Sequence, residues 1–136
     1  MILGLDPSLR NFGWTLIRDD GHFMDKGTMH TDTKTMFVQR YITLREGLRE
    51  IVQKVRSDHP DEILRVGIES PIFNDLYSEG MYGLFLYSNE ALMLEKCDTV
   101  YLSPGQVKAH AAAFLNRPKG WKMGKGDMVD AAKQAT

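Results

Sequence analysis

Two short apolar runs at the start of the chain lie on either side of a polar turn. The first, residues 2–5, leads directly to Asp6 and is followed by Pro7, which cannot donate to a sheet ladder, so a strand should end there. Asn11 and Gly13 suit a turn that brings the second run back antiparallel to the first. This pattern predicts a hairpin that places one carboxylate at the end of a buried strand.

A third apolar run, Ile63–Ile68, also ends on an acidic residue, Glu69, and Ser70-Pro71 then breaks the strand. If the strands of Asp6 and Glu69 are neighbours, their carboxylates lie close together and repel each other. A shared hard cation such as Mg²⁺ would relieve that repulsion. Two other interpretations stay open: Asp6 could cap its own loop in an Asx turn, and Glu69 could be an exposed acid at a strand end.

The remaining pattern predicts further strands and a long helix. Asp20-Gly21 signals a turn between strands over Trp14–Asp19 and His22–Thr28. Thr31-Asp32-Thr33 is typical of a helix cap, and the helix after it should end near Ser57, before Pro60. Arg40 and the other charged residues fall off its apolar stripe, which recurs at spacings of four and three and predicts packing against a sheet: Phe37, Tyr41, Leu44, Leu48, Ile51 and Val55.

The second half of the chain alternates helices and strands. A helix over Glu79–Lys96 is apolar nearly all round, which indicates burial on two sides, either in the core or against a second subunit. A strand over Thr99–Leu102 follows, and Ser103-Pro104 is a good helix start. The pattern predicts a last helix that begins near Lys125 and still runs at Thr136. We therefore expect one α/β domain over residues 1–136, with a mixed sheet of three antiparallel and then two parallel strands flanked by helices.

Composition narrows the class of protein. Hydrophobic residues make up 43% and charged residues 26% of the 136, as in ordinary soluble globular domains. No apolar run approaches the ~18 residues of a membrane span, and no basic region precedes the first apolar run, so neither a membrane segment nor a signal peptide is expected. Cys97 is the single cysteine, which fits a reducing cytoplasm. The four histidines show no zinc-ligand spacing.

Charge is distributed unevenly, although the net charge is only −1. Residues 103–136 carry six Lys or Arg and two Asp, whereas the rest of the chain carries 11 Lys or Arg against 16 acidic residues. A basic C-terminal segment beside an acidic remainder can form a phosphate-binding face. A solvated basic tail is an equally simple interpretation of the charge alone.

Three motifs together resemble one known family. The segment 2–8 with Gly13-Trp14 resembles the opening motif of the RuvC-type Holliday junction resolvases, and of their phage-like variants in particular, within the ribonuclease H-like nuclease superfamily. Gly67–Pro71 resembles the second acidic motif of that family. Tyr101–Lys108 resembles its motif of a strand, a proline and then Val-Lys. Order and spacing agree from residue 1 to about residue 108.

The resemblance implies a ribonuclease H-like fold and a homodimer that resolves four-way DNA junctions. Cleavage would be symmetric hydrolysis of phosphodiesters with Mg²⁺ or Mn²⁺, in the cytoplasm of a bacterial or phage-infected cell. Asp6 and Glu69 fall on catalytic, metal-binding carboxylates of the family. The implied DNA-binding residues are Lys108, beside the junction backbone; Phe73, one residue from an aromatic that contacts bases; Lys125, on a later helical lysine; and Lys122, in the basic loop.

One part of the family pattern departs from this chain. The family has an acidic pair on its last helix, and Asp127 and Asp130 fit that pattern on one helical face. They come early after Lys108 and overlap the Lys125 motif. We therefore expect the pair to lie beyond Thr136, so that the domain lacks its last helix, and a role of Asp127 and Asp130 as ligands stays open.

Two other functions compete with that of a nuclease. A catalytically impaired protein of the same fold could still bind branched DNA through Phe73 and the basic C-terminal residues. An ATPase of the actin and sugar-kinase type also begins with a strand, an Asp and a hairpin. That fold needs a glycine-rich turn to hold phosphates, whereas Pro-Ser-Leu-Arg follows Asp6 here, and 136 residues are too few for its two lobes.

Overall fold

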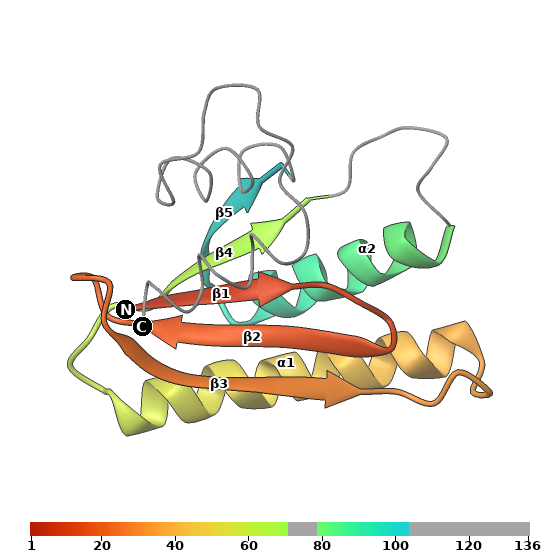
Figure 1. Ribbon diagram of the computed structural model, residues 1–136, viewed down its shortest axis with the longest axis horizontal. Coiled ribbons are helices and arrows are strands. Elements are labelled where there is room, and N and C mark those ends of the chain that lie inside the picture. Colours follow the sequence, from red (N-terminus) through yellow and green to blue (C-terminus); the bar gives the residue numbers. More distant parts are fainter. Residues whose placement is uncertain (71–78, 104–136) are drawn as a thin grey trace, which may run out of the picture.

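A computed structural model describes residues 1–70 and 79–103 (Figure 1). In this part of the chain, helices and strands alternate after an initial run of three strands. The elements, in chain order, are β1 (Ile2–Asp6), β2 (Asn11–Ile17), β3 (Phe23–His30), α1 (Phe37–Asp58), β4 (Arg65–Glu69), α2 (Glu79–Leu94) and β5 (Asp98–Leu102).

The five strands form one mixed sheet in the order β3-β2-β1-β4-β5, with β1 at its centre. β1 and β2 are antiparallel, as are β2 and β3, whereas β4 runs parallel to both β1 and β5. Figure 1 shows the arrowheads of β1 and β4 pointing the same way, and that of β2 pointing back. The α/β fold, with three antiparallel strands followed by two parallel ones, is therefore confirmed.

Both helices pack on the same face of this sheet (Figure 1). Side chains alternate between the two faces of a strand, so Leu3 and Leu5 of β1 point into the core while Asp6 points to the other face. The helices and strands share one apolar core, whose largest buried side chains are Phe12, Leu3, Leu44, Leu48, Ile68, Leu84, Leu92, Val52 and Val66. The face opposite the two helices is where the acidic strand ends project.

The start of α1 differs from the prediction. The helix begins at Phe37 with Met36 as its N-cap residue, and no side chain caps it. The predicted cap at residues 31–33 is therefore wrong. The Asp32 carboxylate instead accepts a hydrogen bond from the N–H of Lys34 at 2.9 Å, within a separate turn. Asx turns and helix caps use the same local side-chain chemistry, so the sequence pattern alone does not distinguish them.

Two side chains on the first turn of α1 also have burial opposite to that predicted. Phe37, predicted to be core, is 55% exposed, and its ring stacks on Tyr41 with the centroids 6.2 Å apart. Arg40, predicted to face solvent, is only 7% exposed. The other buried positions include Val52, which the stripe did not contain, and four residues that it did: Tyr41, Leu44, Leu48 and Val55.

The hairpins are confirmed, with shifted boundaries. Asn11 and Gly13 lie within β2, not in the turn, which spans Pro7 to Arg10. Asp20-Gly21 does form the turn between β2 and β3: Gly21 has a φ of +90°, which glycine adopts at little steric cost. The helix predicted over 79–96 ends at Leu94.

The second helix is buried on one side in this chain. Leu84, Ser88 and Leu92 are buried, whereas Leu86 and Met93 are 64% and 69% exposed. The nearly uniform apolar pattern of α2 therefore has a core side and a solvent side. Among the described residues, no helix is both long and apolar enough to span a lipid bilayer.

Candidate metal centre

Asp6 and Glu69 come together at one end of the central strands. Each is the last residue of its strand, β1 or β4, and the two strands are parallel neighbours in which Leu5 is opposite Ile68. Adjacent strands lie about 4.8 Å apart, so the next residue of each strand also faces its neighbour across the sheet. Both acidic residues follow buried positions and project from the face opposite α1 and α2.

Among the described residues, three glycines flank these acids on the sheet. Gly4, Gly13 and Gly67 lie on the same face of the sheet as Asp6 and Glu69, because side chains alternate along each strand and the register aligns these positions. A Cβ atom at Gly13 would lie 3.8 Å from the Cβ of Asp6. Ligands can therefore approach the backbone beside the carboxylates more closely than larger side chains would allow.

The carboxylate of Asp6 is exposed to solvent but not fully hydrated. Partial burial of the Asp6 carboxyl group raises its pKa above the ordinary value of 3.8. The metal-free site therefore disfavours the charged carboxylate. A bound cation would favour the ionised form and reverse this effect.

The chemistry of the donors fits a hard divalent cation. Carboxylate oxygens are the usual protein ligands of Mg²⁺ and Mn²⁺, and two carboxylate residues end neighbouring strands here. Within residues 1–70 and 79–103, no group of three or more His, Cys, Asp or Glu side chains is placed to hold a metal ion. In the described part of the chain, Asp6 and Glu69 are thus a pair of candidate ligands without a third such side chain beside them.

Several predicted site residues lie outside the described residues. Phe73 falls between β4 and α2, and the others follow Ser103, so the structure does not relate them to the two acids. These residues are Phe73, Lys108, Lys122, Lys125, Asp127 and Asp130.

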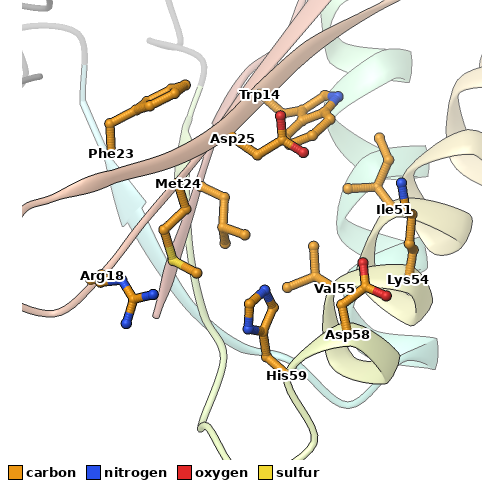
Figure 2. A pocket seen from close by; sticks show the side chains of 11 residues that line it. Trp14, Arg18, Phe23, Met24, Asp25, Ile51, Lys54, Val55, Asp58 and His59 are labelled. Carbon is orange, nitrogen blue, oxygen red and sulfur yellow. The ribbon is translucent and has the colours of Figure 1, made fainter.

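A cavity of about 420 Å³ lies elsewhere in the molecule (Figure 2). It opens between α1 and the strands β2 and β3, on the helix-covered face of the sheet. Its lining includes Leu16 and Arg18, near the end of β2 that pairs with the start of β1. Figure 2 shows Met24 and His59 directed toward its centre. The cavity thus faces away from Asp6 and is not part of the acidic site.

Features that the sequence pattern missed surround the acidic pair. The sequence did not show which glycines lie beside the acids, because the pairing register of the strands determines which glycines flank a carboxylate. Thr31 bonds to the loop after Asp6, and Arg40 donates to Thr31, although the sequence favoured a helix cap and a solvent-facing position for them. No sequence signal marked Arg40, because its burial depends on a contact with Thr31 that the fold creates.

Comparison with known proteins places this geometry in a class. No protein-family model matches the sequence. Among solved structures, Thermus thermophilus RuvC matches 96% of this chain and 89% of its own, with a TM-score of 0.61 and 12% sequence identity. The same protein in complex with a Holliday junction substrate matches with a TM-score of 0.64 over 96% and 86% of the two chains. The fold is therefore ribonuclease H-like.

Sequence comparison points to the same proteins. The chain is 39% identical to the crossover junction endodeoxyribonuclease RuvC of Bartonella bacilliformis over 56 residues, which are 39% of this chain and 34% of that protein. It is 39% identical to RuvC of Agrobacterium fabrum over 64 residues, 45% of this chain and 36% of the relative. The matched segments span about a third of the length of these curated relatives. The predicted resemblance to RuvC-type proteins, in sequence and in fold, is confirmed.

Proposed function

We propose that this chain is a structure-specific endodeoxyribonuclease that resolves four-way DNA junctions by symmetric hydrolysis of phosphodiesters. The observation that carries the proposal is the placement of Asp6 and Glu69 as neighbouring strand ends, opposite the two described helices, in a fold like that of RuvC. The names of the curated relatives and the substrate in the Thermus complex support the same reaction class.

The proposed cofactor is Mg²⁺ or Mn²⁺, held by Asp6 and Glu69. Bound there, the metal would supply activation of water and stabilisation of the leaving oxygen in phosphodiester hydrolysis. The carboxylates of this chain supply negative oxygen donors, and the glycines beside them leave the approach to the backbone open. Basic side chains would neutralise the phosphate that is cut.

The remaining donors of the site are an open part of the proposal. Asp127 and Asp130 carry carboxylates at the helical spacing of three residues, and an acidic pair further along a longer chain would serve equally. Changing Asp127 and Asp130 to Asn separates these choices: loss of cleavage assigns them to the site, and full cleavage assigns the role to other acids.

DNA binding and dimerisation belong to the same proposal. Lys108, Lys122 and Lys125 would contact phosphates, and Phe73 would contact bases at the branch. The exposed apolar side of α2, with Leu86 and Met93, supports a homodimer, and a twofold dimer matches the twofold character of a junction. We place the protein in the cytoplasm of a bacterial or phage-infected cell, which its single, unpaired Cys97 fits.

The test is cleavage of a synthetic four-way junction with and without Mg²⁺. We expect paired cuts that need the metal, and loss of cleavage in Asp6→Asn with junction binding retained. Asp98→Asn is the matched control, because Asp98 starts β5 at the opposite end of the strands and is an exposed acid. Normal cleavage by Asp6→Asn would refute the mechanism.

A branched-DNA-binding protein without nuclease activity is the second candidate. The finding that favours it is the two-donor site among residues 1–70 and 79–103, since two-metal sites ordinarily use more carboxylates. Tight metal-independent binding of four-way junctions, without cleavage at any Mg²⁺ or Mn²⁺ concentration, would select this candidate.

A further inference from the structure

The loop that follows Asp6 is fastened to the chain just after β3. Residues 7–10 connect β1 to β2, and Thr31 binds two of their carbonyls. Its hydroxyl donates to the carbonyl oxygen of Leu9, and its N–H donates to that of Arg10 at 3.2 Å. One residue therefore holds two consecutive carbonyls of this loop.

Arg40 holds the Thr31 hydroxyl through a hydrogen bond from α1. The Nε of Arg40, on the first turn of α1, donates to Thr31 Oγ1 at 2.9 Å. Its guanidinium lies 5.7 Å from the centre of the Phe37 ring. Because Arg40 is only 7% exposed, losing this acceptor would leave a buried donor unsatisfied, which is costly. The Thr31 hydroxyl thus accepts from α1 and donates to the Asp6 loop, in a defined direction.

The same turn of α1 also holds the beginning of α2. The Tyr41 hydroxyl donates to the carbonyl of Gly80 at 2.9 Å. Leu9 packs here too, since a Cβ at Gly80 would lie 3.0 Å from its Cδ1. The loop after Asp6 is therefore held from two sides, by Thr31 at its backbone and by α2 at its Leu9 side chain.

The Asp6 side chain needs such support. Within the described residues, no hydrogen bond or ion pair holds its carboxylate in place. Its direction is then set by the backbone of β1 and of the loop that leaves it. Metal ligands must be held to within a fraction of an ångström, and groups behind the ligands commonly supply that precision.

We propose that Thr31 and Arg40 are positioning residues, which orient Asp6 for metal through the loop of residues 7–10. The inference rests on the proposed function only in taking Asp6 as a metal ligand. It makes no use of DNA or of cleavage. Neither residue would touch the metal or the reacting atoms. Their effect is therefore on the metal affinity of the DNA-free protein.

The test measures Mn²⁺ affinity by calorimetric titration of the DNA-free protein. Thr31→Val keeps the shape of the side chain but removes both hydrogen bonds of the hydroxyl, and Thr31→Ser keeps them. We expect Thr31→Val to weaken Mn²⁺ binding about tenfold, the lower end of the effect of groups behind a ligand. Thr31→Ser should stay within about twofold of the unchanged protein.

Thr43→Val is the matched control. The Thr43 hydroxyl also donates to a backbone carbonyl, that of Gln39 at 2.9 Å, but on an exposed position of α1 away from the loop. Its Mn²⁺ affinity should not change. If Thr31→Val unfolds, Arg40→Gln replaces it, and amide exchange of Thr31 in the unchanged protein reports whether the bond to Arg10 is kept.

Each outcome has one meaning. Equal Mn²⁺ affinity in Thr31→Val and in the unchanged protein overturns the positioning role, as does a Thr31 amide that exchanges as fast as an open loop. Mn²⁺ binding that Asp6→Asn abolishes and Thr31→Val weakens supports the role, even if no junction is cut. Failure to cut junctions then counts against the proposed nuclease and leaves the positioning role intact.

Discussion

Asp6 is a residue whose charge opposes folding in the absence of metal. Its pKa is raised by burial, so the folded chain holds the proton more tightly than the unfolded chain does. Folding is therefore weakened as the pH rises through the folded pKa, and the penalty is complete above it. The proposed metal-binding role and stability would therefore make opposite demands on this side chain.

Asp6→Asn should therefore stabilise the metal-free protein at neutral pH. The gain should be below about 1 kcal/mol, because the carboxylate is only partly buried and water screens its charge. It should vanish at pH values below 3.8, where Asp6 is protonated in both states. Thermal unfolding at several pH values measures it, with Asp98→Asn as the control. A gain that grows as the pH falls would contradict this account.

Lys108→Ala tests the proposed phosphate contact at the residue scale. Junction affinity should fall, and the slope of log affinity against log salt should become shallower by about one unit, as for one lost phosphate contact. Fluorescence anisotropy over a salt series measures both. Lys26→Ala, at an exposed position of β3, is the control. An unchanged slope in Lys108→Ala would show that this lysine does not contact the backbone.

At the scale of elements, α1 and α2 approach closely enough for glycine to be required. A Cβ at Gly83 would lie 2.5 Å from the Tyr41 ring. Alanine is ordinarily better than glycine inside a helix by about 1 kcal/mol. The ring of Tyr41, fixed by its bond to Gly80, reverses that preference at this position.

Gly83→Ala should therefore destabilise the protein by about 1–3 kcal/mol, the range of overpacked cores. Denaturant unfolding measures this loss. The control is the double change Tyr41→Leu with Gly83→Ala, which removes the ring that Ala would meet. The double change should lose less than the two single changes add up to. Strict additivity would indicate that the two residues do not compete for space.

The pattern of apolar positions predicted elements better than it predicted contacts. Spacings of two and of three to four recur over many residues, so β1, α1 and α2 are close to their predicted ranges. Burial of Arg40 depends on two partners, Thr31 and Phe37, that only the folded chain brings together. Thr31 is a residue type typical of helix caps, yet its hydroxyl donates to a loop carbonyl 22 residues earlier.

The candidate site was predictable in part for the same reason. An acid that ends an apolar run can be recognised from sequence, and topology then decides whether two such acids meet. The parallel pairing of β1 and β4 places Asp6 beside Glu69. The glycines that flank them could not be selected in advance, since register determines which of the 12 glycines face the acids.

At the scale of the whole molecule, the exposed side of α2 predicts self-association. Leu86 and Met93 are large apolar side chains left in solvent beside a well-packed core. Met93→Glu should convert a dimer into a monomer of 15.5 kDa, detected by sedimentation at micromolar concentration. Ile63→Glu is the control, because Ile63 is 75% exposed before β4, away from α2. A sedimenting monomer in the unchanged protein would end the proposal of a homodimer.

The pairing of β1 with β4 also fixes when the acidic site can exist. β1 and β2 are joined by four residues, so their hairpin closes quickly, whereas Ile2 meets Arg65 only after a long chain closure that includes α1. Asp6 and Glu69 therefore become neighbours late in folding. In stopped-flow refolding, Mn²⁺ binding should appear with the slowest folding phase, and an earlier binding phase would contradict this. The two acids of the proposed metal site are thus side by side only in a chain whose central sheet is complete.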